Sequence, residues 1–131
     1  MQAGRTRWLV DAMNVIGTRP DGWWRDRHRA IARLVAQLEA FARAEDAEVC
    51  VVLEYPPSPP ITSEVVEVAH APRGGRDAAD DEIARRVQAD ADPASLRVAT
   101  SDRRLAERVR AAGAEVEPAA AFRARLDAVG G

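Results

Sequence analysis

The sequence predicts an α/β protein, a three-layer α/β/α sandwich with a mostly parallel central sheet. Two observations carry this prediction. Short apolar runs, typical of buried parallel strands, alternate along the chain with amphipathic stretches at helical spacing. Carboxylates also stand directly after several of these runs, at the strand ends where open parallel sheets bind ligands.

The first half of the chain is predicted to contain three strands and one long helix. The run Trp8–Val10 is apolar throughout, as expected of a buried strand. Residues 26–44 place their apolar side chains at helical spacing and predict an amphipathic helix. Residues 48–54 form a second apolar strand, and the proline-rich stretch 55–60 can continue neither a strand nor a helix. Residues 64–69 alternate only partly, which favours a strand near the sheet edge.

The second half is predicted to alternate helices and strands. The glycine pair at 74–75 leads into a helix, and residues 96–100 form the fourth strand. A helix follows from about 103 to 112, with Gly113 as its C-cap. A short strand and a terminal helix beginning at proline complete the pattern over 114–126.

Length and composition narrow the functional classes. The 131 residues fit one domain, with an ordered core expected over about 6–128. A net charge of -2 gives no overall basic footprint, so contact with nucleic acid would have to rest on a local arginine patch. Cys50 is the single cysteine and is expected to be a buried thiol. Neither a signal peptide nor a bilayer-spanning run is apparent, so we expect a cytoplasmic protein without membrane contact.

Polar side chains at strand ends and helix starts point to one site. Asp11 ends the first strand, Asn14 follows it, and Asp102 opens the helix after the fourth strand. Right-handed connections would bring the first and fourth strands together, so Asp11 and Asp102 should face each other, and the helix start that carries Asp80 and Asp81 can close a third side. These oxygen donors suit Mg²⁺ or Mn²⁺ better than zinc. Such a site could activate water for phosphodiester hydrolysis.

Structural roles compete with this interpretation at several positions. Acidic residues in the first turn of a helix complement its dipole, which accounts for one or two of the four acidic residues there. These four are Asp77, Asp80, Asp81 and Glu82. Ser101 or Asp102 would also serve as an N-cap. Trp23 and Trp24 could stack on bases, but packing is favoured, with one ring buried and the other partly exposed.

Three segments resemble the motifs of the NYN domain family, in particular its YacP-like branch of ribonucleases, which is related to PIN and FLAP-type nucleases. The segments are Val10–Ile16, Ala79–Ile83 and Val98–Asp102. The resemblance spans almost the whole chain, in the order and spacing of the family. It implies a PIN-like α/β/α sandwich and an endoribonuclease activity that depends on Mg²⁺ or Mn²⁺.

Matched by position, the resemblance implies that Asp11 is the central metal ligand, with Asn14 as its polar support. Asp80 and Asp102 would supply the other carboxylates, and Asp81, at a position that varies, is a further candidate ligand. Supporting roles are expected for Ser101, Asp77 and Glu54, and contacts to the RNA backbone for Arg73 and Arg76. Ala12 stands where the family usually has glycine, and Glu54 stands where it often has aspartate. If the backbone at position 12 needed a positive φ, Ala12 would be strained.

The leading hypothesis is therefore a metal-dependent endoribonuclease whose partner is RNA, with a recruiting protein or the ribosome as a further candidate partner. The alternative is a catalytically inactive RNA- or protein-binding module of the same fold. A third hypothesis, a phosphatase with an aspartate nucleophile, ranks last. The segment around Asp11 lacks the second aspartate two residues on that many such enzymes have.

Overall fold

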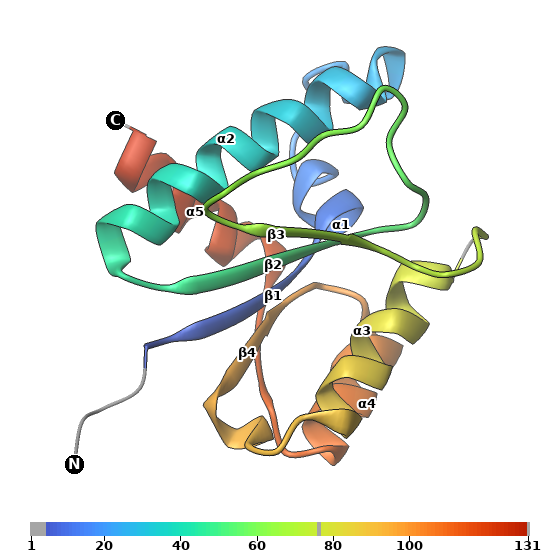
Figure 1. The fold of residues 1–131 in the computed structure, drawn as a ribbon, viewed down its shortest axis with the longest axis vertical. Coiled ribbons are helices and arrows are strands. Elements are labelled where there is room, and N and C mark those ends of the chain that lie inside the picture. Colours follow the sequence, from blue (N-terminus) through green and yellow to red (C-terminus); the bar gives the residue numbers. More distant parts are fainter. Residues whose placement is uncertain (1–4, 76, 131) are drawn as a thin grey trace.

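A parallel sheet lies at the centre of the computed structural model, which describes residues 5–75 and 77–130 (Figure 1). Within these residues the sheet has five strands in the order β3-β2-β1-β4-β5, and every pairing between neighbours is parallel. The strands are β1 (Arg7–Asp11), β2 (Glu48–Leu53), β3 (Glu67–His70), β4 (Leu96–Ala99) and β5 (Glu115–Glu117). The predicted α/β sandwich and the predicted neighbourhood of the first and fourth strands are confirmed.

Helices cover both faces of this sheet. Figure 1 shows α1, α2 and α5 on one side and α3 and α4 on the other. Their bounds are α1 (Ala12–Ile16), α2 (Arg27–Glu45), α3 (Ala78–Ala89), α4 (Arg103–Ala111) and α5 (Ala119–Gly130). Short 3-10 turns occur at η1 (Trp23–Arg25) and η2 (Pro93–Ser95). Among the helices of the described ranges, none is both long and apolar enough to cross a membrane.

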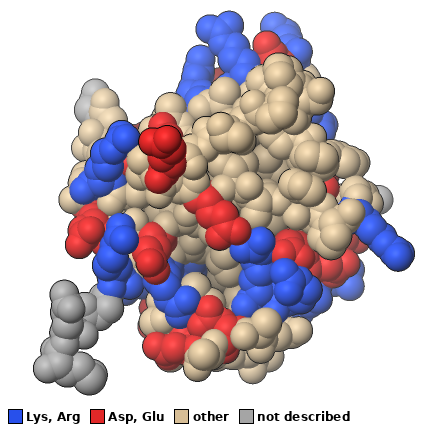
Figure 2. Space-filling view, in the orientation of Figure 1, with Lys and Arg blue, Asp and Glu red and all other residues tan. Residues whose placement is uncertain are grey.

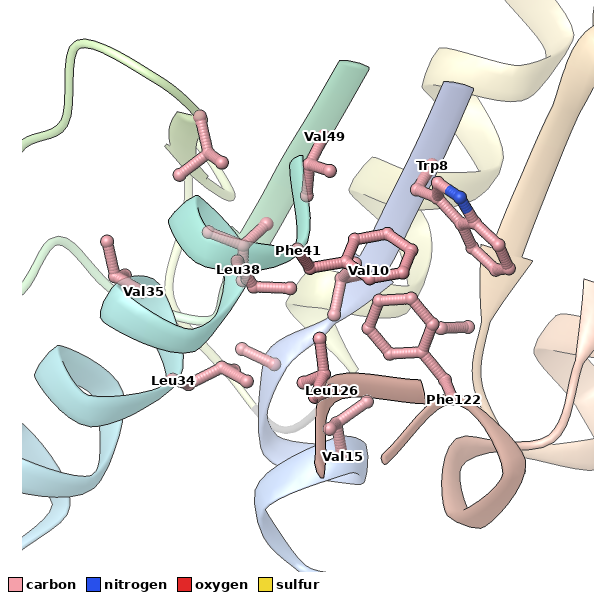
Figure 3. Packing of buried hydrophobic residues seen from close by; sticks show 14 of the residues in the cluster. Trp8, Val10, Val15, Leu34, Val35, Leu38, Phe41, Val49, Phe122 and Leu126 are labelled. Carbon is pink, nitrogen blue, oxygen red and sulfur yellow. The ribbon is translucent and has the colours of Figure 1, made fainter. Parts of the chain in front are cut away.

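Strand β1 contributes to both cores because successive side chains of a strand point to opposite faces. Trp8 packs with the α1, α2 and α5 layer, whereas Leu9 packs with the α3 and α4 layer. Phe41 and Phe122 place their ring centroids 6.0 and 4.8 Å from that of Trp8 (Figure 3). This packing on both faces fixes the strand that ends in Asp11.

Three elements differ from the sequence prediction, one of them α5, which continues to Gly130 rather than ending at residue 126. Strand β3 lies at the edge as expected but begins at Glu67 rather than at residue 64. The hydroxyl of Ser63 accepts the N–H groups of Val65 and Val66, and this local turn replaces sheet pairing there. Helix α1 was not predicted, because five residues are too few to show helical periodicity.

The expectation of a buried cysteine is confirmed, whereas neither tryptophan of the predicted pair is fully buried. Cys50 is buried in β2. Trp23 is half-buried against the α2 side of the core, and Trp24 is 50% exposed. The tryptophan pair therefore packs one ring and leaves the other at the surface.

An arginine clamp joins the start of β1 to the segment that follows α3. The guanidinium of Arg7 donates two hydrogen bonds of 2.9 Å to the carboxylate of Asp90 and a third to the main-chain oxygen of Asp92. The hydrogen bonds from Arg7 hold the pKa of Asp90 below its usual range. The clamp thus ties the sheet to the α3 layer at the end opposite Asp11.

Replacing Asp90 with asparagine is expected to lower the free energy of unfolding by about 1 kcal/mol at pH 7. Because the folded-state pKa of Asp90 lies below the ordinary value of 3.8, the stabilisation is present above that pH and disappears as the pH falls through the lower folded value. Urea unfolding at pH 7 and in stronger acid measures both effects. Asp46→Asn is the control, since Asp46 pairs with Arg5 but is 87% exposed. Equal losses in the two variants would contradict the clamp.

Candidate active site

Asp11 lies at the carboxyl end of the central strand, where β1 passes into α1. Asp11 is only 5% exposed, because β1 lies between β2 and β4. The Thr100 hydroxyl, just beyond β4, donates a hydrogen bond of 2.9 Å to the Asp11 carboxylate. Burial raises the pKa of Asp11 to about 6, and the charges of Asp102 and Glu54 act in the same direction, against the hydrogen bond from Thr100. The structure therefore holds a carboxylate that is costly to ionise at the sheet edge.

The turn after β4 is fastened to this carboxylate by its own side chains. The Thr100 hydroxyl also accepts the N–H of Asp102 at 3.1 Å, so it bridges Asp11 and Asp102. Asp102 in turn caps α4 by accepting the N–H of Leu105 at 2.9 Å. One threonine hydroxyl thus links the ends of β1 and β4, as the predicted switch point requires.

Asn14 and Ser101 fix the same junction through the main chain. The Asn14 side-chain oxygen accepts the N–H of Ser101 at 2.7 Å. The Ser101 hydroxyl accepts the N–H of Ala119, the first residue of α5, at 2.8 Å. Both predicted residues therefore lie at the edge and hold α1, the β4 turn and α5 together.

The acidic run at the start of α3 divides between two roles. Asp80 is half-buried, and burial followed by the charges of Asp11 and Asp102 raises its pKa to about 7. Asp81 is instead paired with Arg108 of α4 at 2.8 Å. Glu82 is buried and accepts hydrogen bonds from Arg85 and Arg86, which lower its pKa to about 2. Asp80 therefore belongs electrostatically to the sheet edge, whereas Asp81 and Glu82 are engaged by arginines.

The remaining candidates lie around this centre. Asp77, at the start of α3, raises the pKa of Asp80, and Glu54, after β2, raises that of Asp11. Arg73 is exposed and lines an open groove of about 430 Å³ beside α3. Arg76 lies outside the described residues.

The carboxylates at this edge are suitable ligands for a hard cation such as Mg²⁺, but they are not already positioned around a single point. The charge of Asp102 raises the pKa of Asp11, and the charges of Asp11 and Asp102 raise that of Asp80, because like charges are gathered there. Their carboxylate oxygens are ligands that Mg²⁺ and Mn²⁺ prefer, and a divalent cation would offset their repulsion. Within residues 5–75 and 77–130, no group of three or more His, Cys, Asp or Glu is already arranged to hold a metal ion. The residues fit such an ion by chemistry and charge.

Thr100 is a site residue that the sequence prediction missed, and Ala12 is a position where the predicted strain is absent. The signal that could have identified Thr100 is a hydroxyl at a strand end, directly before Ser101 and Asp102. Ala12 is buried in α1, and Asp46 is the non-glycine residue with a positive φ in the described part of the chain. The helical backbone at Ala12 therefore carries no strain of the kind that glycine would relieve.

Comparisons with known proteins agree with this architecture. Rae1 (YacP) from Bacillus subtilis superposes with a TM-score of 0.76 at 22% identity, over 94% of this chain and 74% of that chain. A point mutant of the same protein gives a TM-score of 0.78 at 24% identity, over 95% and 76% of the two chains. At these identities the likeness establishes the fold. No curated protein matches the sequence significantly.

A match to a sequence-family model identifies the family, which the structural likeness alone does not. The model described as a YacP-like NYN domain matches residues 8–130, which include all three motif segments. Nuclease-type function is characteristic of that family. The chain belongs to the YacP-like NYN domain family.

Proposed function

We propose that this protein is a metal-dependent endoribonuclease that hydrolyses RNA phosphodiester bonds at the carboxyl edge of its sheet. The observation that carries the proposal is the electrostatic coupling of Asp11, Asp80 and Asp102, which come from three separate segments. Burying like charges together costs stability, and such a cost is characteristic of functional sites. Membership of a nuclease-type family supports the same conclusion.

In this proposal Asp11, Asp80 and Asp102 would hold Mg²⁺ or Mn²⁺. The ion, when bound, supplies Lewis acidity and a more acidic water. Thr100 orients the Asp11 carboxylate, and Asn14 and Ser101 keep the two strand ends in register. Asp81 acts on the site through its charge on Asp80, since its own carboxylate is paired with Arg108.

The RNA backbone needs positive charge close to this acidic edge. Arg73 and Arg76, on either side of the glycine pair, are the proposed contacts to phosphate. They act on any sequence, since phosphate contacts position a strand without reading its bases. A recruiting protein or the ribosome would supply selection of the target.

Cleavage of mixed single-stranded and structured RNA with Mn²⁺, Mg²⁺ or EDTA tests the proposal. We expect cutting with metal and none with EDTA. Asp80→Asn should reduce the rate about a hundredfold or more, whereas Asp81→Asn, whose aspartate is paired with Arg108, should stay within a few-fold of wild type. A folded wild type that binds RNA equally in EDTA and metal, yet never cuts it, would instead establish the inactive binding module.

A further inference from the structure

A small pocket opens beside the carboxylate edge, between the starts of α1 and α2 and the segment that follows β2. Its volume is about 190 Å³. Its walls are largely apolar and include Met13, Ile31, Tyr55 and the prolines at 56–57. Arg27 and His28 add polar groups at the start of α2. We call this the Tyr55 pocket.

The tyrosine that gives the pocket its name is held in place while much of its ring stays exposed. Tyr55 is 55% exposed, which is unusual for a large aromatic residue outside an interface. Gly74 lies against it so closely that a Cβ at that position would come within 2.4 Å of the ring. The missing side chain at Gly74 therefore makes room for the ring, and the glycine loop supports it from one side. This leaves a positioned aromatic surface of the kind on which nucleic-acid bases stack.

The pocket adjoins the candidate active site through two residues. Met13 lines the pocket and lies two positions after Asp11 in the sequence. Glu54 also lines the pocket, and it directly follows β2, the strand whose Val52 pairs with Asp11. A group bound in the pocket would thus lie next to the carboxylate edge.

Arg27 lines the other side of the pocket, at the start of α2, and two more arginines lie close to it in the sequence. Arg25, Arg27 and Arg29 are exposed at η1 and the start of α2. Figure 2 shows arginine side chains projecting from the top of the molecule, where Figure 1 places these elements. The Arg27 guanidinium also lies over the Trp23 ring, 5.5 Å from its centroid. An apolar slot with an aromatic wall and a guanidinium beside it matches a base and its phosphate.

We propose that the Tyr55 pocket receives one unstacked base of single-stranded RNA, with Arg27 contacting the adjoining phosphate. The bound base would set where the strand lies relative to Asp11, and so which nucleotides flank the cut. This inference rests on the proposed endoribonuclease function and extends it to a preference for unpaired substrate. Duplex RNA would not fit, because its bases are stacked and paired.

Binding in EDTA tests the pocket without any dependence on cleavage. Fluorescence anisotropy would use labelled heptanucleotides of uridine, cytidine and adenosine, with wild type and four variants. Tyr55→Ala and Gly74→Ala, which remove or displace the ring, should weaken binding of the best oligonucleotide about tenfold. Tyr55→Phe should bind like wild type. Trp24→Ala is the matched control, since Trp24 is exposed to a similar degree but does not line the pocket, and should also bind like wild type.

Mapping the cut sites with metal separates this inference from the function on which it rests. Tyr55→Ala should flatten the base preference beside the cut. If wild type cuts RNA but Tyr55→Ala binds and cuts with unchanged affinity and preference, the pocket assignment is overturned and the function stands. Oligonucleotide binding that depends on Tyr55, in a wild type that never cuts, would leave the pocket assigned and overturn the nuclease. Equal loss in Trp24→Ala, or no oligonucleotide binding by folded wild type, would also overturn the pocket.

Discussion

Asp11→Asn is expected to lower the rate of metal-dependent RNA cleavage by about three orders of magnitude. Asp11 is the most buried of the three coupled carboxylates and lies on the central strand of the sheet. Asparagine keeps the shape and can still accept the hydrogen bond from Thr100, but it removes the negative charge. Initial rates on one RNA substrate at saturating Mn²⁺ measure the loss. A rate near that of wild type would remove Asp11 from the chemistry.

The same substitution should make the metal-free protein more stable. Burial raises the pKa of Asp11 to about 6, so the ionised carboxylate is present at pH 7 at a cost to folding. Removing the charge also relieves the repulsion felt by Asp80. We expect urea unfolding in EDTA at pH 7 to show a gain of about 1 kcal/mol for Asp11→Asn. Lower activity together with lower stability would instead indicate a damaged fold.

The position of Asp11 opposite the β4 turn could be predicted from the sequence because it follows from topology. Alternating apolar runs and amphipathic stretches predict a parallel sheet, and the handedness of its connections places the first and fourth strands side by side. The observed register, with Val10 beside Ala99, brings Asp11 next to Thr100. The placement of the two strand ends could therefore be predicted together with the sheet.

The division of the acidic run in α3 could not be predicted in the same way. Consecutive helical residues point in directions about 100° apart, so Asp80, Asp81 and Glu82 must face different surroundings. Which of them meets arginine depends on α4, which supplies Arg108 to Asp81, and on Arg85 and Arg86 one turn further along α3. Tertiary packing alone determines which carboxylate pairs with arginine, and the sequence composition does not distinguish between them.

Helix α1 and the role of Thr100 were missed for a related reason. Five helical residues carry too little periodicity to be recognised, although Val15 and Ile16 are apolar and pack into the core. One of the two hydrogen bonds of Thr100 is local, to Asp102, but the other joins it to Asp11, which lies 89 positions away in the sequence. The role of a hydroxyl that donates to the Asp11 carboxylate and accepts the N–H of Asp102 can be recognised only when the two strands are placed beside each other.

Thr100→Val is expected to reduce cleavage by about thirtyfold, because it removes the one hydroxyl that bridges Asp11 and Asp102. Valine has nearly the same shape, so packing in this buried position is retained. The variant leaves an Asp11 oxygen and the N–H of Asp102 without this partner, which should also cost about 1–2 kcal/mol of unfolding free energy. Thr100→Ser restores the hydroxyl and should recover most of the activity.

If Thr100 positions the Asp11 carboxylate, its replacement should change the metal concentration that cleavage requires. A purely structural role predicts no such change. If the hydroxyl aims the Asp11 carboxylate, Thr100→Val should need a higher Mn²⁺ concentration for half-maximal cleavage, and Thr100→Ser should need about as much as wild type. Loss of packing alone would lower stability and leave that concentration unchanged. Rates measured across a Mn²⁺ titration, beside urea unfolding of the same variants, distinguish the two. An unchanged Mn²⁺ requirement in a stable Thr100→Val variant would mean that the bridge holds the strand ends together without orienting Asp11.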